Sequence, residues 1–505
     1  MKILIPMSGI GKRFKDAGYS SPKYLLNSID RTVLEHILSL FPGEEDINLI
    51  MNKIDFFDPQ IKNKIDEIVC NENIKIHYVE NHKKGPGYAL LSSGLLDTED
   101  EVFVNYCDFS NLWDWNDVKK SILKNKYDGL LPAYKGLHLH SIYGNYYAFI
   151  KNNKDKVLSV KEKEPFTEKP IEEYASTGGY YFSSGKMAKH YLEKLFESEY
   201  LINGEAYISS AYELMIKDGL SVGLYDIEHF FQWGTPEDFE EFNYCIDEIV
   251  SLKDENQIDL TEINLILPVA GEGKRFKDAG YDTPKIFLNV DGEKMISKII
   301  NKFTNQISTH ILTTNELEPE LKELFSNQQE IKLKSVDFTT RGQADSSRLL
   351  VNGITNDKPI FIQSGDTILE SFNLDFLNNQ EFDLVVFTKK SYRRASSSPL
   401  NYGWIHTSGN QIVDTAIKKA PKNSEYSMIL GSFIFKNKDV FNSLFKDIEN
   451  SGHKELHIDF MISAALERKL VVKEYSLEKS LVLGTPVEYK LYNYAEYIYN
   501  SMKEL

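Results

Sequence analysis

The stretch Ile3-Leu-Ile-Pro-Met-Ser-Gly-Ile-Gly-Lys-Arg-Phe-Lys-Asp-Ala-Gly-Tyr-Ser-Ser-Pro-Lys23 returns later in the chain as Leu265-Ile-Leu-Pro-Val-Ala-Gly-Glu-Gly-Lys-Arg-Phe-Lys-Asp-Ala-Gly-Tyr-Asp-Thr-Pro-Lys285. In both copies an apolar run leads into a Gly-x-Gly-Lys-Arg loop, and a Pro-Lys pair follows at the same distance. A buried strand that ends in such a loop is a common way to bind phosphate groups, because the loop presents backbone N–H donors. We therefore expect two homologous halves that act on an anionic ligand.

The length of the chain agrees with two domains. A chain of 505 residues is too long for one hydrophobic core, and two domains of about 250 residues each are expected. The repeat predicts these domains at 1–251 and 262–505, with a short polar linker between them. Later residues return in the same order, since Asp108 matches Asp366 and Gly234 matches Gly484.

Composition excludes several classes of function. The net charge of −17 argues against a nucleic-acid partner but leaves a small phosphorylated ligand open. The three cysteines are widely spaced and form no CxxC motif, which argues against a zinc site and indicates a reducing compartment. We see no signal peptide and no apolar run of the ~18 residues that a membrane helix needs. We expect a cytoplasmic protein without a membrane span.

Strand and helix patterns alternate at the start of each half. In the first half we predict strands at Ile3–Met7, Ile47–Met51, Ile74–Val79 and Glu101–Cys107. Helices are predicted from about Asp30 to Phe41, at Pro59–Cys70 and from the Gly85 turn through Leu96, and Thr32 and Glu35 can form a capping box in the first of them. This alternation predicts an α/β fold with a mixed, mostly parallel sheet flanked by helices.

The second part of the first half reads as strands with turns, then helices. The predicted strands are Tyr143–Ile150, Val157–Lys163, Ala175–Phe182 and Ser221–Asp226, and the predicted helices are Ser184–Phe196, Glu205–Lys217 and one that starts at Thr235-Pro236.

Several further motifs recur in both halves and strengthen the glycine loop, which alone is weak evidence. The loop is not the dinucleotide fingerprint, because Phe14 and Phe276 stand where the third glycine should be. The recurring pairs are Gly85-Pro-Gly-Tyr-Ala89 with Arg341-Gly-Gln-Ala344, Asn105-Tyr-Cys-Asp108 with Gln363-Ser-Gly-Asp366, Tyr143-Gly144 with Tyr402-Gly403, Glu162-Lys163 with Lys418-Lys419, Thr177-Gly-Gly179 with Gly431, and Gly234-Thr-Pro with Gly484-Thr-Pro.

This ordered series resembles the sugar-phosphate nucleotidylyltransferase family, and the resemblance covers nearly all of both halves. It implies two tandem Rossmann-like nucleotidyltransferase domains that join an NTP to a phosphorylated small molecule and release pyrophosphate. The family also implies Mg²⁺ as the cofactor. The family loop usually reads Gly-x-Gly-Thr-Arg, whereas Lys12 and Lys274 stand in the place of the threonine here.

The predicted site residues fit that chemistry. An acceptor phosphate is already ionised at neutral pH, so the site needs positioning and charge neutralisation and no general base. The catalytic cations are expected to be Arg13, Lys23, Lys163, Arg275, Lys285 and Lys419. The nucleotide-binding residues are expected to be Ser8, Gly9, Gly11, Lys12, Gly85, Gly87, Ala270, Gly271, Gly273, Lys274, Arg341 and Gly342. The substrate-binding residues are expected to be Gly144, Glu162, Thr177, Gly179, Glu205, Gly403, Lys418 and Gly431.

Asp108 and Asp366 are the predicted metal ligands. The family usually supplies a second carboxylate two residues before Gly-Thr-Pro, where this chain has Gln232 and Val482. We therefore expect the metal to take its other ligands from nucleotide phosphates and water. Plainer interpretations stay open: Asp108 as a helix N-cap, and Arg13 and Lys163 as solvated side chains.

The two halves differ on the acceptor side. Glu162 is matched to Lys418, and Tyr207 and Ser209 are matched to His457 and Asp459. These differences predict that the two sites handle different substrates, but drift in a half that only supports its neighbour would also explain them. The motif Phe231-Gln-Trp-Gly-Thr-Pro, with Asn-Tyr-Cys-Asp108, resembles a sub-group found with capsule and surface-glycan biosynthesis, where CTP is one nucleotide used.

Two other functions compete with this interpretation. A glycosyltransferase of related fold would use an NDP-sugar, but it depends on an Asp-x-Asp motif that neither Asp108 nor Asp366 provides. A nucleotide-binding regulatory module without catalysis is the other, and the intact Arg13 and Lys23 argue against it in the first half. We expect the two halves to form an intramolecular pseudo-dimer.

Overall fold

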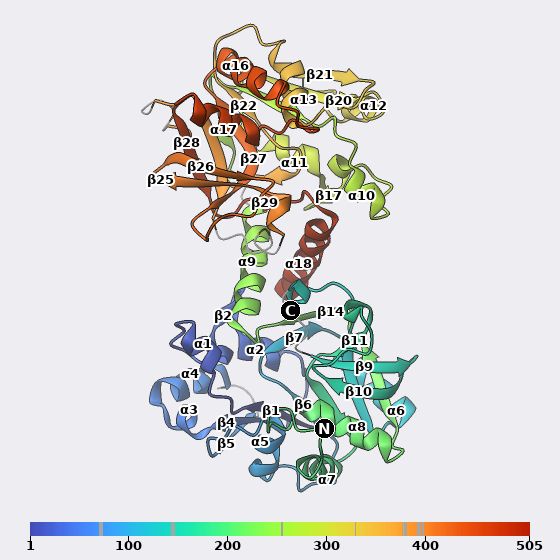
Figure 1. The fold of residues 1–505 in the computed structure, drawn as a ribbon. Coiled ribbons are helices and arrows are strands. Elements are labelled where there is room, and N and C mark those ends of the chain that lie inside the picture. The colour runs from blue at the N-terminus through green and yellow to red at the C-terminus, as the bar shows by residue number, and fades with distance from the viewer. Residues whose placement is uncertain are drawn as a thin grey trace. The chain divides into compact units, whose positions relative to one another are not determined.

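The computed structural model divides the chain into two compact units (Figure 1). Unit 1 comprises Met1–Ile246 and Tyr494–Leu505, and unit 2 comprises Asp247–Asn493. The structure describes residues 1–69, 74–142, 147–253, 256–328, 330–375, 377, 381–390, 395 and 398–504. The predicted site residue Gly144 lies outside these described residues. None of the described helices is long and apolar enough to cross a membrane.

The core of unit 1 begins with four parallel strands. These are β1 (Lys2–Met7), β4 (Ile47–Asn52), β5 (Ile74–Val79) and β6 (Val102–Asn105), in the order β6-β1-β4-β5. The register pairs Ile3 with Ile47 on one side of β1 and with Phe103 on the other. Because parallel strands end at the same edge, the loop after β1 and the loop after β6 are brought side by side.

The other half of the same sheet is mostly antiparallel. Its strands are β8 (Gly129–Tyr134), β9 (Ala148–Asn153), β10 (Lys156–Glu162), β11 (Tyr174–Ser176), β12 (Gly179–Phe182) and β13 (Val222–Asp226). The full order is β11-β9-β10-β13-β8-β12-β6-β1-β4-β5, and only β8 and β13 are parallel in this part. The predicted mixed α/β class is confirmed, but a smaller part of the sheet is parallel than we predicted.

Helices cover the sheet of unit 1, and their ends follow the sequence signals. They are α1 (Lys12–Asp16), α2 (Val33–Leu38), α3 (Lys53–Phe57), α4 (Pro59–Val69), α5 (Pro86–Ser93), α6 (Trp115–Asn125), α7 (Gly185–Phe196), α8 (Ile208–Lys217) and α9 (Pro236–Leu252). The predicted capping box of α2 is present, with the Thr32 hydroxyl accepting from the Glu35 amide and the Glu35 carboxylate accepting from the Thr32 amide. Helix α6 was not predicted.

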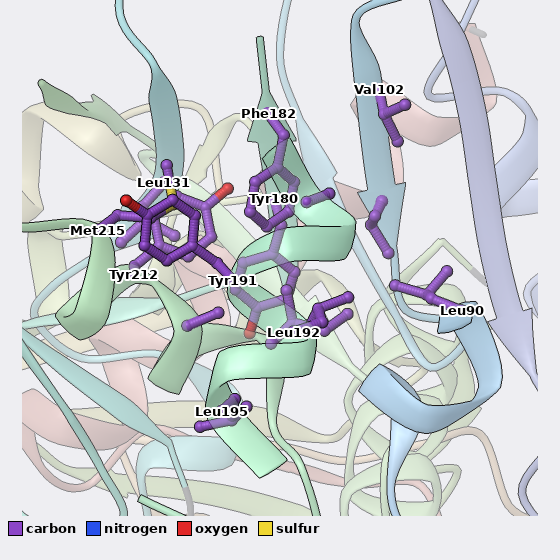
Figure 2. Close-up of a cluster of buried hydrophobic side chains, with 14 of the residues drawn as sticks. Leu90, Val102, Leu131, Tyr180, Phe182, Tyr191, Leu192, Leu195, Tyr212 and Met215 are labelled. Atoms are coloured by element: carbon purple, nitrogen blue, oxygen red, sulfur yellow. The ribbon is translucent and has the colours of Figure 1, made fainter. Parts of the chain in front are cut away.

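Unit 1 has a core of aromatic and aliphatic side chains between its helices and its sheet. Figure 2 shows Tyr191, Leu192 and Leu195 of α7 and Tyr212 and Met215 of α8 gathered beside strand residues such as Phe182. Tyr212 is fully buried, and its hydroxyl donates to the carbonyl of Tyr181 at 2.5 Å. Burying a polar hydroxyl this deeply requires such a partner. Helices α7 and α8 are therefore fixed on the sheet.

Unit 2 has the same strand order. Its sheet reads β21-β20-β16-β22-β27-β24-β28-β26-β25. The strands are β16 (Asn264–Pro268), β20 (Ser308–Thr314), β21 (Ile331–Val336), β22 (Ile360–Ile362), β24 (Leu384–Lys389), β25 (Gly403–Ser408), β26 (Gln411–Ile417), β27 (Ser427–Phe435) and β28 (Val472–Leu477). The helices are α10 (Lys274–Asp278), α11 (Met295–Asn301), α12 (Glu318–Leu324), α13 (Gln343–Val351), α16 (Lys438–Glu449), α17 (Asp459–Glu467) and α18 (Pro486–Glu504).

One strand differs between the units. The predicted strand Ala175–Phe182 is broken in unit 1 into β11 and β12, whereas its counterpart in unit 2 is the continuous β27. Gly178 lies in the break with a φ of 97°, and Gly431 lies within β27 with a φ of 73°. Glycine adopts a left-handed φ without steric cost. In β27 the pairing with β24 shifts register near this glycine, between Val386 and Thr388, so the strand continues through an irregularity where β11 and β12 separate.

Candidate functional site

The loop after the first strand has the same backbone in both units. Gly11 and Gly273 adopt left-handed φ angles of 63° and 62° and cap the short helices α1 and α10. The phenylalanine at the place of the missing third glycine is buried in each unit. Phe14 packs edge-on against Tyr19 and Phe239, and its counterpart Phe276 packs against Tyr281 and Tyr489. This aromatic contact anchors a loop whose tip stays exposed.

The tip of the loop leaves room for a ligand. A Cβ atom placed on Gly9 or on Gly271 would meet nothing within 4 Å, so the fold itself does not require glycine there. Lys12, Arg13, Lys274 and Arg275 are exposed beside the tips, and Ser8 and Ala270 are buried at their bases. Glycine at an unhindered position allows another molecule to approach the backbone closely.

A lysine–aspartate ion pair faces the loop in each unit. Lys23 Nζ lies 2.5 Å from Asp108 Oδ2, and Lys285 Nζ lies 2.6 Å from Asp366 Oδ2. Burial works against the charge of Lys23, but the Asp108 carboxylate outweighs it, so the pKa of Lys23 is raised. Burial likewise works against the charge of Asp366, but Lys285 and a hydrogen bond from Ser364 lower its pKa.

Equivalent backbone hydrogen bonds hold Asp108 and Asp366 in the two units. The carbonyl of Asp108 accepts from the Trp233 amide at 2.7 Å, and the carbonyl of Asp366 accepts from the Leu483 amide at the same distance. A Cβ on Gly234 would lie 3.5 Å from Asp108 Oδ2, and one on Gly484 would lie 3.4 Å from Asp366 Oδ2. The recurring Gly-Thr-Pro motif therefore packs its glycine directly against the aspartate.

These aspartates suit Mg²⁺ as partial ligands. Within the described ranges, no three His, Cys, Asp or Glu side chains gather closely enough to hold a metal ion by themselves. Mg²⁺ typically binds through one or two carboxylates and keeps water and substrate phosphates as its other ligands. A single carboxylate beside an open glycine loop fits that pattern.

A second glycine loop contacts the acceptor side in each unit. The Lys84 carbonyl accepts from the Ala206 amide, and in unit 2 the Arg341 carbonyl accepts from the Leu456 amide. Gly85 and Gly342 have left-handed φ angles, and a Cβ on either would lie within 3 Å of this backbone. Gly87 matches Ala344, since their amides donate to the carbonyls of Ala206 and Leu456. The contact also fixes Ala206 and Leu456 as equivalent positions.

The predicted acceptor side of unit 1 contains two groups of hydrogen-bonded polar side chains. Lys163 Nζ donates to the Tyr207 hydroxyl at 2.8 Å, and that hydroxyl donates to Glu205 Oε2 at 2.6 Å. Ser209 Oγ donates to Glu162 Oε2 at 2.5 Å. Burial raises the pKa of Glu162, against the opposing effects of Ser209 and Lys163. Lys163 immediately follows β10 with a left-handed φ of 60°.

A cavity of about 520 Å³ brings many of the predicted residues of unit 1 together. The predicted residues that line it are Ser8, Gly9, Gly11, Lys12, Lys23, Gly85, Asp108 and Glu205. Tyr207 also lines it and links it to Lys163. Arg13, Gly87, Glu162, Thr177 and Gly179 are not among the lining residues. Thr177 and Gly179 are instead buried next to the break between β11 and β12.

Comparison with known proteins gives one family match. A family model described as nucleotidyl transferase matches residues 263–489. The second half contains a nucleotidyl transferase domain. No curated protein matches the chain.

Solved structures similar to the chain each span about half of it. A nucleoside-diphosphate-sugar pyrophosphorylase from Vibrio cholerae RC9 is 22% identical, with a TM-score of 0.39, covering 48% of this chain and 99% of its own. The inositol-1-phosphate CTP transferase from T. maritima is 18% identical, with a TM-score of 0.36, covering 47% of this chain and 96% of its own. A UDP-glucose pyrophosphorylase from Acinetobacter baumanii is 17% identical, with a TM-score of 0.37, covering 49% of this chain and 93% of its own. At such identities and scores no substrate can be transferred to this chain.

The pairing of β25 with β26 in unit 2, compared with that of β9 with β10 in unit 1, shows that one predicted match between the halves was wrong. Gly403 pairs with Ile417 at the start of β25, and in unit 1 Ala148 pairs with Glu162 at the start of β9. Lys418 therefore occupies the position of Lys163, and both adopt left-handed φ angles, of 53° and 60°. The predicted pairing of Lys163 with Lys419, and of Glu162 with Lys418, was wrong by one residue.

The tyrosines before these strands confirm the corrected register. The Tyr147 hydroxyl accepts from Gln232, which also donates to Asp238, while the Tyr402 hydroxyl donates to Glu488. Asp238 and Glu488 are equivalent, each four residues after the glycine of Gly-Thr-Pro. Tyr402-Gly403 therefore matches Tyr147-Ala148, and the predicted match to Tyr143-Gly144 was four residues early.

Two kinds of residue were missed from the sequence. Gly178, not its predicted neighbours Thr177 and Gly179, shares the left-handed φ of Gly431. At the start of α9 the Thr235 hydroxyl accepts from the Asp238 amide and donates to the Asp238 carboxylate. Burial raises the pKa of Asp238 to about 6, and the neighbouring Glu237 and Asp108 add to the rise. The spacing Thr-Pro-x-Asp/Glu is a capping signal that could have indicated these carboxylates.

Proposed function

We propose that the chain is a Mg²⁺-dependent nucleotidyltransferase. Each of its two units joins an NTP to a phosphorylated sugar or related metabolite. An acceptor phosphate oxygen attacks the α-phosphorus in line, and the bond from that phosphorus to the oxygen bridging to the β-phosphate breaks. Pyrophosphate is the leaving group. The observation that carries the proposal is the lysine–aspartate pair that faces an open glycine loop at equivalent positions of both units.

Each group has a role that its position supports. The loop at Gly9 and Gly11 would bind the NTP phosphates through backbone N–H groups. Arg13 and Lys23 would neutralise the charge that develops on the pyrophosphate. Lys163, held beside Tyr207, would contact the acceptor phosphate. Mg²⁺ held by Asp108 would supply further positive charge at the phosphates.

The proposals for the nucleotide and the pathway rest on the sequence resemblance of the first half. We propose CTP as the first nucleotide to test and an activated precursor for a surface polysaccharide as the product. The support is the sequence around Asn105–Asp108 and Phe231–Gly234, which resembles capsule-associated relatives. A second possibility is that one unit is catalytic and the other a scaffold; the acceptor-side differences between the units favour testing it.

The test is pyrophosphate release from CTP, UTP, GTP, ATP and dTTP with a panel of phosphorylated acceptors. The full chain is compared with Asp108→Ala, Asp366→Ala and both together. Loss of a different activity in each single variant would show two active sites. Loss of all activity in only one of them would leave one catalytic unit and one scaffold. Consumption of an NDP-sugar without pyrophosphate release from any NTP would favour the glycosyltransferase instead.

A further inference from the structure

The acceptor sides of the two units place a carboxylate in the same position from different elements. Ala206 and Leu456 make equivalent backbone hydrogen bonds, so Ser209 on α8 matches Asp459 at the start of α17. The strand pairs Ala148–Glu162 and Gly403–Ile417 are equivalent as well. Each unit therefore has one strand residue and one helix residue facing the same space.

In unit 1 the carboxylate comes from the strand. Glu162 is the cross-strand neighbour of Ala148, so their side chains lie on the same face of the sheet. Its Oε2 accepts from Ser209, which is buried on the helix. The helix thus contributes a donor and the strand contributes an acceptor.

In unit 2 the two contributions are exchanged. Ile417 replaces the strand carboxylate, and Asp459 replaces the helix hydroxyl. A Cβ on Gly403 would lie 2.4 Å from Asp459 Oδ2, which places this carboxylate directly over the strand pair. Alanine, the residue at the equivalent position of unit 1, would not fit there. The same Cβ would lie 2.9 Å from Ile429 Cδ1, so glycine leaves room for both the relocated carboxylate and this side chain.

The Asp459 carboxylate has unused acceptor capacity. No side chain in the described part of the chain donates a hydrogen bond to it. Burial raises its pKa, while the neighbouring His457 and Lys418 act in the opposite direction. A half-buried carboxylate that lacks a donor is costly, and a neutral ligand donor would satisfy it without adding to the cations already present.

We propose that Asp459 is the specificity-determining residue of unit 2, where it accepts hydrogen bonds from hydroxyl groups of a sugar or polyol phosphate. This proposal rests on the proposed function and names the substrate class for that unit. Unit 2 thus retains the carboxylate of unit 1 but presents it from the helix, with His457 in place of Tyr207. The two units are expected to bind different hydroxyl arrangements, and unit 2 is not expected to require a more anionic acceptor.

The test uses the full chain carrying Asp108→Ala, which stops turnover in unit 1, and Lys163→Ala, which removes the contact of unit 1 to the acceptor phosphate. Binding of glucose 1-phosphate, glycerol 3-phosphate, phosphoethanolamine and inorganic phosphate is measured by calorimetry before and after Asp459→Asn. We expect the affinity for a hydroxyl-bearing phosphate to fall about 10- to 100-fold, as for loss of a charged hydrogen bond, and that for inorganic phosphate to stay unchanged. Glu467→Gln, at the exposed end of the same helix, is the matched control and should change nothing.

Further variants test the steric relationship. Gly403→Ala should reproduce the loss, because the new Cβ displaces the carboxylate. Gly403→Ala combined with Asp459→Ser and Ile417→Glu rebuilds the arrangement of unit 1 and should restore binding, with the acceptor preference of unit 1. The proposal would be overturned if no hydroxyl-bearing phosphate binds the parent, if Asp459→Asn leaves their binding unchanged, or if phosphoethanolamine alone depends on Asp459.

Pyrophosphate release separates this proposal from the proposed function. If the Asp108→Ala, Lys163→Ala parent releases no pyrophosphate with any pair of substrates, yet binding depends on Asp459 as described, the activity is wrong and the specificity assignment stands. If the parent is active and Asp459→Asn leaves the acceptor KM unchanged, the activity stands and the assignment is wrong.

Discussion

The Lys23 ammonium lies 2.5 Å from the Asp108 carboxylate, and 22% and 26% of the two side chains are exposed. In the absence of ligand each residue satisfies the charge of the other, at the sheet edge where the glycine loop ends. Binding of an NTP with Mg²⁺ would give Lys23 a phosphate and Asp108 a cation. The pair is therefore best understood as a substrate-free arrangement of two residues that act on different partners.

Removing either member of this pair should affect activity far more than stability. We expect Lys23→Met and Asp108→Asn each to lower kcat/KM of unit 1 by about 100-fold or more, and the double variant to lose less than the product of the two. Because the pair is partly exposed, its contribution to the free energy of unfolding should be about 1 kcal/mol at most. Pyrophosphate kinetics and urea unfolding measure the two effects. Equal losses of stability and activity would contradict this account.

Alanine at Gly9 and alanine at Gly11 should have different effects, the first on ligand binding and the second on stability. Gly9→Ala meets no atom of the protein within 4 Å, so unfolding should be unchanged, while KM for the NTP rises about 10-fold or more because the backbone is screened from the phosphates. Gly11→Ala forces a φ of 63° on a residue with a side chain and should destabilise the loop by about 1 kcal/mol. A Gly9→Ala enzyme with normal KM would show that the phosphates do not approach there.

The corrected register predicts which lysine of unit 2 contacts the acceptor. Lys418→Ala should raise the acceptor KM more than Lys419→Ala, since Lys418 shares the left-handed backbone of Lys163. Both are measured in the Asp108→Ala background, with the NTP held saturating. A larger effect of Lys419→Ala would contradict the corrected register and support the match of Lys163 with Lys419 that was predicted from the sequence.

Breaking a buried ion pair should destabilise unit 2 strongly. Lys389 has no exposed side-chain area, and its Nζ lies 3.1 Å from Glu248 Oε1 and 2.6 Å from the Ser480 carbonyl. Lys389→Met leaves the Glu248 carboxylate buried without this cation and should destabilise unit 2 by about 3–5 kcal/mol. Lys422→Met, which removes an ion pair whose lysine is 73% exposed, is the control and should cost less than about 1 kcal/mol. Urea unfolding distinguishes the two.

Unit 1 should lose stability as pH falls below about 6.5. Burial lowers the pKa of His138 to about 4, and burial also lowers the pKa of His140. A histidine with a depressed pKa in the folded state stabilises the fold above its unfolded pKa, and this contribution is lost as the unfolded chain takes up the proton. For His138 the loss between pH 7.5 and pH 5.0 should be about 2 kcal/mol. His138→Gln should remove that part of the pH dependence; an unchanged slope would contradict the assignment.

The parts of the site that follow from local chemistry could be predicted from the sequence. The Thr32–Glu35 capping box, the strand before each glycine loop and the aspartate after the fourth strand all depend on short-range signals. The family resemblance predicted that Lys23 and Asp108 both act at the phosphates, and the structure places the two side chains in contact in the lining of one cavity. The predicted domain bounds and the roles of the site residues stay predictions.

The parts that failed depend on pairing across the chain. The dipeptide Tyr-Gly occurs at residue 143 and again at residue 402, and this likeness gave a false match because the true counterpart of Tyr402 is Tyr147, which no glycine follows. Only the pairing of Ala148 with Glu162 and of Gly403 with Ile417 reveals the shift. The transfer of a carboxylate from a strand to a helix is likewise invisible until both elements are placed.

The fate of the α-phosphorus tests the central claim most directly. Each NTP, starting with CTP, is supplied to the full chain with radioactive phosphorus at either the α- or the γ-position, together with Mg²⁺ and a phosphorylated acceptor. We predict that the α-label moves into the acceptor product while the γ-label appears in pyrophosphate, in equal amounts, and that both transfers vanish in the Asp108→Ala, Asp366→Ala double variant. Transfer of the γ-label to the acceptor, or no transfer from any NTP, would contradict the assignment of nucleotidyl transfer to this site.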